Sequence, residues 1–372
     1  MFTASDAAYM AEALRLAELG RYTTSPNPNV GALLVKNGQV IGRGYHKQAG
    51  GPHAEVFALR EAGSEAQGAT CYVTLEPCSH YGRTPPCAEA LIAAGVSRVV
   101  VAMQDPNPQV AGRGISMLRE AGIAVELGLL EQQARAVNNG FLSRIERKRP
   151  YVQLKLAASL DGRTALANGD SKWLTSEAAR ADVQHFRSQS CAVLSTATTV
   201  IADNARLNIR PEQLLQHVAS LESGEIRQPK RVILDRNGLL DHKLALFNDG
   251  GEVLLCVSNI ENKRELPNIA RHIHCPLTSN AQFDLVALLE HLAVRENINT
   301  LWVEAGATLA GTLLQLQLVD ELIVYVAPKL LGNSAQPLAV LPQFSALSEV
   351  VQLSWTDVRM VGSDIRLCAR LS

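Results

Sequence analysis

The sequence predicts two α/β domains that meet near residues 145–150. The chain has 372 residues, of which 47% are hydrophobic and 19% charged, and this is enough to bury two cores. Helical and strand-like patterns alternate along it, and the charged stretch RIERKRP at 144–150 interrupts the alternation. A run of this kind is typical of a solvated boundary, so we expect domains at 1–147 and 148–372.

The first domain is expected to be a mixed sheet covered by helices. Ser5 or Asp6 can cap a helix that runs to about Leu19, and the dipeptide Asn37-Gly38 predicts a hairpin between two strands. The elements that follow are helices at 53–63, 86–95 and 114–122, and strands at 71–77, 97–103 and 123–128.

The second domain begins with a strand at 151–162 and a helix capped by Ser176. Residues 191–201 indicate a strand that feeds a loop. The remaining elements are strands at 230–235 and 252–258, an amphipathic helix at 283–297, a strand–turn–helix at 299–318, and closing strands at 320–332 and up to 370. The order again predicts an α/β domain.

Charge and cysteine usage exclude several classes of protein. The net charge is −1, without the basic excess of proteins that bind nucleic acid. No apolar run reaches the roughly 18 residues that span a bilayer, and the first twenty residues do not resemble a secretory signal. The seven cysteines are odd in number, which argues against a disulfide framework. We therefore expect a cytoplasmic protein with a small-molecule substrate.

A metal-binding pattern lies in the first domain: His53-Ala54-Glu55, then Pro77-Cys78, and then Cys87. One imidazole and two thiolates can hold a tetrahedral zinc ion with one position open for water. In zinc deaminases the glutamate of an H-x-E motif carries protons and is not a ligand. By this division of roles, the sequence predicts His53, Cys78 and Cys87 as zinc ligands and Glu55 as the general acid and base.

The cysteine spacing departs from the usual signature of these enzymes. Cys78 and Cys87 are nine positions apart, whereas the general pattern places its two cysteines three apart. The alternative is that Cys87 is a core residue and His53 a surface imidazole. Either residue alone fits that alternative better, but the combined pattern favours zinc.

Two glycine patterns lie further along the chain. Gly112-Arg113-Gly114 lacks the third glycine of a dinucleotide fingerprint and indicates a helix start. The stretch from Gly306 to Thr312 has no lysine after its second glycine, which excludes a P-loop. It can cradle a phosphate at a helix N-terminus or form a tight packing turn, and the pattern alone leaves both open.

Three segments of the first domain, TSPNPNVGALLV, GYHKQAGGPHAE and LEPCSHYGRTPPC, resemble the deaminase domain of the bifunctional deaminase–reductases of riboflavin biosynthesis. That family shares the long cysteine spacing. The resemblance implies a three-layer fold like that of cytidine deaminase, zinc on His53, Cys78 and Cys87, and Glu55 as proton carrier. The residues implied to contact the pyrimidine ribotide are Asn27, His46, His80 and Arg83, although His80 could instead stabilise its loop.

Four segments of the second domain, at 155–165, 171–176, 198–210 and 302–314, resemble the reductase half of the same family, which implies a dihydrofolate-reductase-like fold and NADPH. The implied cofactor contacts are Ala157, Trp173, Thr199, Asp203, Gly306, Ala307, Thr308, Leu309, Ala310, Gly311 and Thr312. The implied substrate contacts are Ser171, Arg187, Leu207, Arg210 and Glu304. We assign Lys155 a catalytic role in orienting the ribose oxygens; Asp161 is a second polar group in that region. Alternatively, Trp173 is a core aromatic and Asp203 a helix cap.

The sequence thus predicts a bifunctional enzyme that removes an amino group from a diaminopyrimidine ribotide and then reduces its ribosyl group to a ribityl group. We also expect a homo-oligomer. One alternative is a deaminase whose C-terminal domain only assembles subunits or binds a ligand. Another is a deaminase that edits nucleic acid, which is disfavoured because the chain lacks both a basic excess and the short cysteine spacing.

Overall fold

The computed structural model describes residues 2–79, 81, 85–108, 110–214, 227–248, 250–259 and 266–371. The chain divides into two compact units, Met1–Lys148 and Arg149–Ser372, and this division falls one residue after the boundary expected from the sequence. In the described part of the chain, no helix combines the length and the apolar character needed to cross a membrane.

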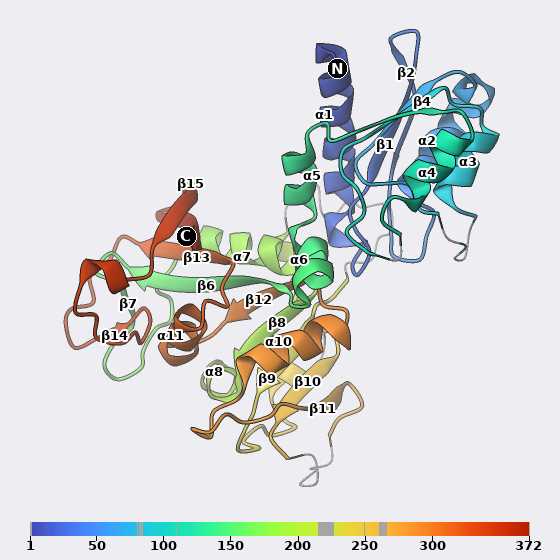
Figure 1. Ribbon diagram of the computed structural model, residues 1–372. Helices are drawn as coiled ribbons and strands as arrows, with labels where there is room; N and C mark the ends of the chain where they lie inside the picture. The colour runs from blue at the N-terminus through green and yellow to red at the C-terminus, as the bar shows by residue number, and fades with distance from the viewer. Residues whose placement is uncertain are drawn as a thin grey trace. The chain divides into compact units, whose positions relative to one another are not determined.

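The first unit is a five-stranded sheet between two layers of helices (Figure 1). The strand order is β2-β1-β3-β4-β5, with β1 antiparallel to both neighbours and β3, β4 and β5 mutually parallel. The strands are β1 Gly31–Lys36, β2 Gln39–Tyr45, β3 Thr70–Val73, β4 Arg98–Val101 and β5 Ala124–Leu127. The helices are α1 Ala4–Leu19, α2 Ala54–Ala62, α3 Cys87–Ala93, α4 Arg113–Glu120, α5 Glu131–Val137 and α6 Asn139–Arg147.

Each face of this sheet has its own hydrophobic core. Helices α2, α3 and α4 cover one face through side chains such as Ala58, Leu91 and Leu118. Helices α1, α5 and α6 cover the other, where Met10 and Leu142 are buried. The strands alternate between the two cores, as expected for a sheet that is buried on both faces. This arrangement confirms the predicted mixed sheet between helices.

The second unit is built on a nine-stranded sheet. Its order is β11-β10-β9-β8-β12-β6-β13-β16-β15, parallel from β11 to β13 and antiparallel at β16 and β15. The strands are β6 Tyr151–Ser159, β8 Ala192–Thr196, β9 Lys230–Leu234, β10 Val253–Val257, β11 Ala270–His274, β12 Thr300–Glu304, β13 Glu321–Ala327, β15 Leu353–Val361 and β16 Asp364–Leu371, and a separate pair is formed by β7 Arg163–Ala165 and β14 Gln336–Pro337.

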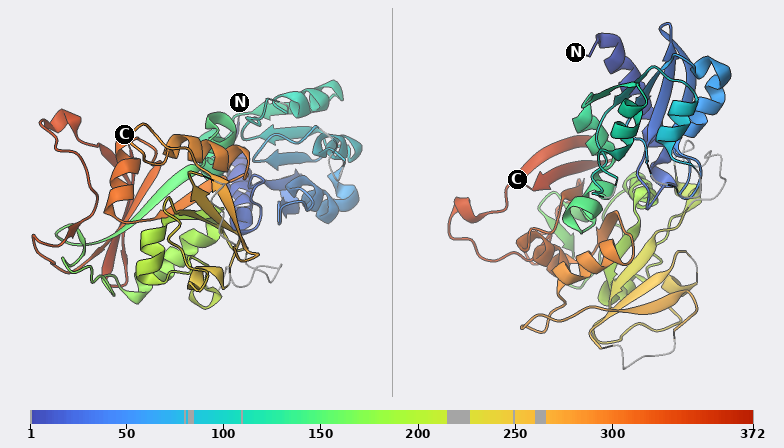
Figure 2. Two further views of the ribbon diagram at one scale, coloured as in Figure 1. Left: turned by 90° about the horizontal axis from the view of Figure 1, so that it is seen from below. Right: turned by 45° about the vertical axis from the view of Figure 1, so that its right-hand side comes forward.

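Helices cover both faces of the central part of this sheet (Figure 2). On one side, α10 Leu285–Val294 and α11 Ala307–Gln315 bury side chains against β6, β8 and β12. On the other side, α7 Glu177–Gln189 and α8 Ala197–Asp203 do the same. Because β6, β8, β9, β10 and β12 are parallel neighbours, their carboxyl ends share one edge of the sheet, which is where ligands of such sheets bind.

Three local predictions can be compared with the structure. The hairpin at Asn37-Gly38 is confirmed, since both residues have positive φ angles of 52° and 77°. The cap of the first helix is Thr3 and not Ser5 or Asp6, because Thr3 and Asp6 form a reciprocal capping box. The strand predicted at 191–201 ends at Thr196, and residues 197–203 form helix α8, because the Thr196 side chain accepts the Thr199 N–H and starts the helix.

Candidate functional site

The three predicted zinc ligands lie together in the first unit. His53 caps the start of α2, Cys78 lies in the segment after β3, and Cys87 is the first residue of α3. The Nδ1 atom of His53 is 3.2 Å from Sγ of Cys87 and 3.5 Å from Sγ of Cys78, and all three ligand atoms lie within 4.8 Å of one another.

This cluster fits a zinc ion. Zinc–sulfur and zinc–nitrogen bonds of usual length at a tetrahedral centre place N and S ligand atoms about 3.6 Å apart. The hydrogen bond from Cys87 and the neighbouring His53 imidazole lower the pKa of the Cys78 thiol. Cys78 therefore favours the thiolate form, which is the form that binds metals.

Two close contacts fix the positions of these ligands. A Cβ atom on Gly44 in β2 would lie 2.0 Å from the carbonyl oxygen of Ala54, so glycine lets the start of α2 approach the sheet. A Cβ on Gly114 would lie 1.9 Å from the carbonyl oxygen of Pro77, so the start of α4 can pack against the segment of Cys78.

Glu76, which no motif in the sequence marks, holds this second contact. Its buried carboxylate accepts the backbone N–H groups of Asp105, Gly112, Gly114 and Ile115 at 2.9–3.3 Å. An anion at a helix N-terminus is favourable, so Glu76 joins the Pro77-Cys78 segment to α4. The only signal for it was an acidic residue at the end of an apolar strand.

Glu55 is buried beside the ligand cluster. Its side chain is 3% exposed, and Oε2 has no hydrogen-bond partner among the described residues. Burial raises the pKa of Glu55 to about 7, although the nearby His53 opposes the rise. An orphaned carboxylate oxygen in a buried site is costly unless a ligand or a solvent molecule partners it.

Asn27 and His46 form a hydrogen-bonded pair next to this cluster. The Nδ1 atom of His46 lies 3.0 Å from the carbonyl oxygen of Pro52, which can only accept, so Nδ1 carries the proton. The Nε2 atom of His46 then accepts from Nδ2 of Asn27 at 3.0 Å, which turns the amide oxygen of Asn27 away from His46. The His46 and His53 rings meet edge to face at 5.4 Å. His80 and Arg83 lie outside the described residues.

The second unit brings Lys155 and Glu304 together. They are register partners on the parallel strands β6 and β12, where Lys155 lies in the middle of β6 and Glu304 is the last residue of β12. Glu304 receives two hydrogen bonds from Arg187, at 2.5 and 2.9 Å, and one from Nε1 of Trp302 at 2.9 Å. Burial opposes ionisation of Glu304, but the Arg187 guanidinium outweighs it and lowers the pKa of Glu304 to about 2. Burial also lowers the pKa of Lys155.

The predicted substrate contacts of this unit differ in exposure. Arg187 is buried, and its third hydrogen bond goes to the carbonyl oxygen of Asn208, so its guanidinium is engaged by the protein. Arg210 and Ser171 are exposed, whereas Leu207 is buried with a positive φ angle of 54°.

The predicted cofactor contacts around α8 lie at the same edge of the sheet. Thr199 is in the first turn of α8, and the exposed Asp203 at its end pairs with Lys172 at 3.4 Å. Trp173 is 65% exposed, so it is not a core aromatic, and the guanidinium of Arg180 lies 4.5 Å from its ring centroid. Ala157 is half-buried on β6. Arg180 was missed because nothing in the sequence places it beside Trp173.

The stretch 306–312 forms the start of α11. Gly306 caps this helix without a side-chain hydrogen bond, and the space around its Cα is open. Ala307, Thr308 and Leu309 form the first turn, Ala310 and Gly311 are buried, and Thr312 donates to the carbonyl oxygen of Thr308. The free N–H groups of this turn fit a phosphate group. Asp161 accepts the N–H groups of Leu331 and Gly332 and anchors that loop.

Comparison with known proteins agrees with this architecture. Residues 150–367 match the family described as the RibD C-terminal domain, and residues 3–103 match the cytidine and deoxycytidylate deaminase zinc-binding region. The riboflavin biosynthesis protein RibD of Escherichia coli (strain K12) is 51% identical over 97% of this chain and 98% of that protein. The protein of the same name from Haemophilus influenzae is 50% identical over 98% of this chain and 97% of that protein.

Two solved structures cover 99% of this chain and 99% of their own. Acinetobacter baumannii RibD superimposes with a TM-score of 0.89 at 46% identity. The diaminohydroxyphosphoribosylaminopyrimidine deaminase/5-amino-6-(5-phosphoribosylamino)uracil reductase of Thermotoga maritima does so with a TM-score of 0.85 at 33% identity.

The fold and the sites define a two-domain enzyme that joins a zinc-binding deaminase unit to a reductase unit. The match over 150–367 disfavours the alternative of a C-terminal domain without catalytic function. The chain belongs to the RibD family of riboflavin biosynthesis proteins.

Proposed function

We propose that the chain catalyses two successive reactions. The first unit hydrolyses the 2-amino group of 2,5-diamino-6-ribosylamino-4(3H)-pyrimidinone 5′-phosphate, which releases ammonia and leaves a carbonyl group. The second unit then reduces the ribosyl group to a ribityl group with NADPH. The observation that carries the proposal is the cluster of His53, Cys78 and Cys87 beside the unpartnered oxygen of Glu55. The Thermotoga maritima relative is named for both activities.

In the deaminase, His53, Cys78 and Cys87 hold the metal, and Glu55 moves protons. Bound zinc supplies an activated water molecule near neutral pH. The Oε2 atom of Glu55 would take one proton from the attacking water molecule and pass it to a ring nitrogen of the pyrimidine. It would then take the second proton, from the hydroxyl group formed on the ring carbon, and pass it to the departing amine, so that ammonia leaves as the carbonyl group forms. The buried position of Glu55 keeps bulk water from competing for these protons.

Asn27 and His46 position the pyrimidine in this proposal. His46 is fixed as the Nδ1–H tautomer and holds the amide of Asn27, whose oxygen can accept a hydrogen bond from an amino or ring N–H group. We assign His80 and Arg83 to substrate binding from the family resemblance, Arg83 as a partner of the phosphate.

In the reductase, NADPH and the deaminated pyrimidine ribotide both bind at the carboxyl edge of the parallel sheet. Bound NADPH supplies the hydride, and the turn from Gly306 to Thr312 offers N–H groups for its phosphates. Ala157, Trp173, Thr199 and Asp203 line the same edge. Lys155 and Glu304 lie where the ring-opened ribosyl group is reduced, and we assign Lys155 to orienting the ribose oxygens.

The remaining substrate contacts in this proposal are Ser171, Leu207 and Arg210. Arg210, which is exposed, is the better partner for the 5′-phosphate. Arg187 acts through Glu304, whose carboxylate it holds in place.

The direct test uses the full-length protein and the diaminopyrimidine ribotide, with and without NADPH. Ammonia release without NADPH reports the first reaction. Loss of the near-ultraviolet absorbance of NADPH, only after deamination, reports the second. Absence of ammonia release from zinc-loaded protein would contradict the deaminase assignment.

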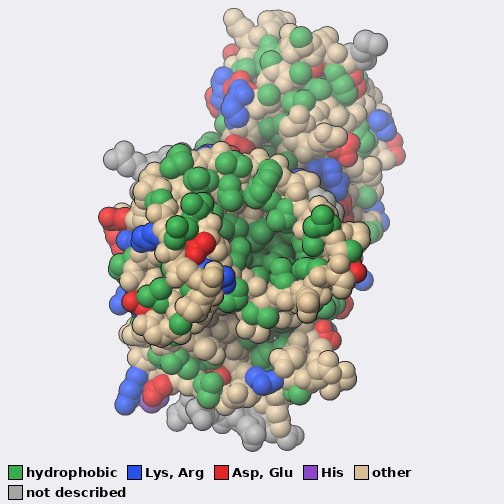
Figure 3. Space-filling view, turned by 90° about the vertical axis from the view of Figure 1, so that its left-hand side faces the viewer, with side chains coloured by type: hydrophobic (Ala, Val, Ile, Leu, Met, Phe, Trp, Pro, Cys, Tyr) green, Lys and Arg blue, Asp and Glu red, His purple; other side chains and the backbone are tan. Residues whose placement is uncertain are grey.

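We also propose how the chain assembles and where in the cell it lies. Strand β15 forms one edge of the nine-stranded sheet and exposes Trp355, Val358 and Met360. Figure 3 shows apolar side chains gathered on one face of the second unit. Exposed apolar edge strands favour pairing with another chain. We therefore propose a homo-oligomer, to be tested by light scattering. None of the seven cysteines, all of which lie in the described part of the chain, forms a disulfide, and this supports a location in the cytoplasm.

A further inference from the structure

The two carboxylate oxygens of Glu304 have different partners. Oε1 accepts hydrogen bonds from Nε of Arg187 at 2.5 Å and from Nε1 of Trp302 at 2.9 Å. Oε2 accepts one hydrogen bond, from Nη2 of Arg187 at 2.9 Å, and no other group of the described residues donates to it. A carboxylate oxygen has two lone pairs, so Oε2 keeps a position at which it can accept a hydroxyl group of a ligand.

Trp302 reaches this carboxylate from the same strand. It stands two residues before Glu304 on β12, so both side chains lie on one face of the sheet. Trp302 is fully buried, and its indole N–H can only donate, so the bond to Oε1 gives this N–H the acceptor that a buried donor needs. The hydroxyl group of Ser195 on β8 donates to the main-chain carbonyl oxygen of Glu304 at 2.6 Å. Contacts from the sheet thus fix both the main chain and Oε1 of Glu304.

Helix α7 holds the ring of Trp302 in place. Phe186, which precedes Arg187 on α7, stacks on Trp302 with ring centroids 5.0 Å apart and an interplanar angle of 13°. The guanidinium of Arg366 lies 5.2 Å from the centroid of Phe186 and donates to Asp182 of the same helix at 2.7 Å. One helix therefore supplies both the guanidinium that binds Glu304 and the ring that supports Trp302.

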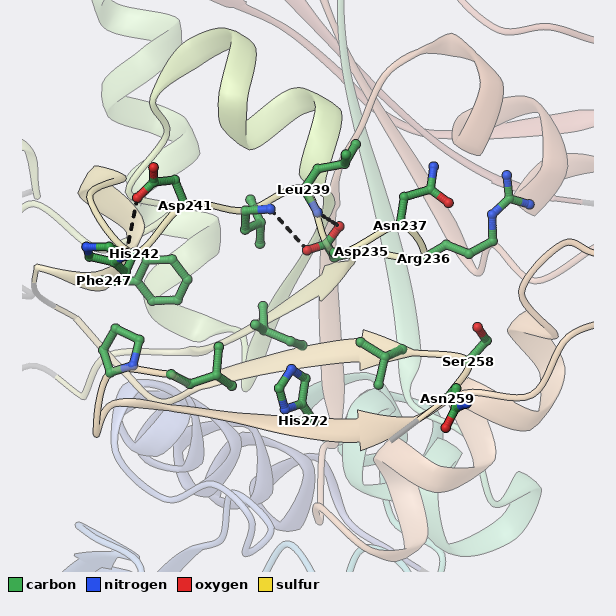
Figure 4. A pocket seen from close by; sticks show the side chains of 16 residues that line it. Asp235, Arg236, Asn237, Leu239, Asp241, His242, Phe247, Ser258, Asn259 and His272 are labelled. Carbon is green, nitrogen blue, oxygen red and sulfur yellow. Dashed lines mark hydrogen bonds and ion pairs between the residues drawn. The ribbon is translucent and has the colours of Figure 1, made fainter. Parts of the chain in front are cut away.

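These two rings lie away from the cavity that the second unit contains. Residues 235–242 and strands β10 and β11 line this cavity of about 550 Å³, and neither Phe186 nor Trp302 is among its lining residues (Figure 4). Substitution of either ring therefore leaves the lining side chains of that cavity unaltered. An effect of Trp302 on the reaction must pass through Glu304.

We propose that Trp302 is a positioning residue of the reductase site: it engages Oε1 of Glu304 and so leaves Oε2 to accept a hydroxyl group of the ring-opened ribosyl chain. The proposal rests on the reductase function proposed above. A bidentate guanidinium holds a carboxylate in its own plane, and the indole N–H adds a third contact from the strand. Rotation of the carboxylate away from the substrate then breaks contacts on two sides.

The test measures reduction of the deaminated intermediate by NADPH with the full-length protein, Trp302→Phe, Glu304→Gln and the double variant. Phenylalanine keeps an aromatic ring beside Phe186 but has no N–H group. Trp302→Phe should lower kcat about tenfold, because one hydrogen bond to a charged group is lost, and should leave the Kd of NADPH unchanged in a titration of NADPH fluorescence. The double variant should be no slower than Glu304→Gln alone, because Trp302 acts through Glu304.

Two further variants separate positioning from stability. Leu288→Ala removes a buried side chain of α10 on the opposite face of the sheet, so it should lower the midpoint of urea unfolding and leave kcat unchanged. Phe186→Leu keeps the indole N–H but removes the stacked ring, and it should lower kcat about threefold. Ammonia release in the absence of NADPH should stay unchanged in every variant, because it reports the first unit.

The outcomes distinguish this proposal from the reductase assignment. If the unaltered protein does not oxidise NADPH on the deaminated intermediate, the proposed function fails and the role of Trp302 fails with it. If it does, an unchanged kcat in Trp302→Phe, or losses that multiply in the double variant, would overturn the role of Trp302 alone. A loss of kcat in Leu288→Ala as large as that in Trp302→Phe would trace the effect to stability and also overturn it. Should Trp302→Phe not fold, an unchanged kcat in Phe186→Leu decides against the proposal.

Discussion

In the first unit, the three ligand side chains and Glu55 all lie between residues 53 and 87 and converge at the starts of two helices. In the second unit, the candidate residues lie between residues 155 and 312 on strands β6 and β12, on helices α7, α8 and α11 and in the connections between them. Lys155 and Glu304 meet only because β6 and β12 are parallel neighbours. The first site is set by local segments and the second by the topology of a sheet. The two sites should therefore respond differently to single substitutions.

The largest expected effect is that of Glu55→Gln on deamination. Glutamine keeps the size of the side chain but cannot accept and release a proton, so ammonia release should fall by about 10²–10⁴-fold. Zinc content should stay unchanged, because Glu55 is not assigned as a ligand. NADPH oxidation on the deaminated intermediate should also persist, and its joint loss would contradict independent sites.

The next effect concerns the metal. Cys87→Ser replaces one of two thiolates with a weaker ligand, so the zinc content of purified protein should fall when measured by elemental analysis. Cys71→Ala is the matched control, because Cys71 is a buried cysteine on β3 outside the cluster. Unchanged zinc in Cys87→Ser would remove Cys87 from the ligand set.

The same contrast explains what the sequence could predict. The combination of an H-x-E motif with a P-C motif and a further cysteine rarely arises for packing reasons alone. The sequence therefore predicts the cluster of His53, Cys78 and Cys87 without knowledge of the fold. The helices and strands of both units followed from periodicity and turn residues. The anchoring role of Glu76 did not, because it depends on backbone N–H groups about 30–40 positions later in the chain.

In the second unit, the candidate residues were ordinary ones. Ala157, Thr199 and Gly306 have no chemistry of their own, and only the family resemblance selected them. The exposure of Trp173 and the pairing of Arg187 with Glu304 arise from tertiary contacts that local patterns do not encode. Residues 197–201 were predicted as the end of a strand because the β-branched residues in this stretch have low helix propensity. They form helix α8 because the cap at Thr196 outweighs that propensity.

The ion pair of Glu304 predicts a pH effect confined to the second unit. The pKa of Glu304 is about 2 in the folded protein and near 4.5 when exposed, so the unfolded chain binds more protons between these values. The free energy of unfolding should thus fall as pH drops from about 5 to 2, by roughly 2–3 kcal/mol from this group.

Tryptophan fluorescence during urea unfolding measures this effect, because all three tryptophans lie in the second unit. Glu304→Gln should lower stability at neutral pH, since it leaves Arg187 buried without its carboxylate, and should flatten the acid dependence. The control is Glu290→Gln, because Glu290 is an exposed residue of α10, and this variant should keep the acid dependence of the unaltered protein. An acid dependence that is unchanged in Glu304→Gln would contradict the pairing.

The smallest expected effect separates the two arginines of the proposed reductase site. Arg210→Ala should raise the KM for the phosphorylated intermediate about tenfold and leave the KM for its dephosphorylated analogue unchanged, because an exposed guanidinium loses only its phosphate contact. Arg187→Ala should instead lower the stability of the unit and affect both substrates alike, since Arg187 is buried against Glu304. Steady-state kinetics with both substrates distinguishes the two, with Arg295→Ala as the control for a lost surface charge. Equal effects of Arg210→Ala on both substrates would show that Arg210, like Arg187, serves the structure of the unit and does not contact the phosphate.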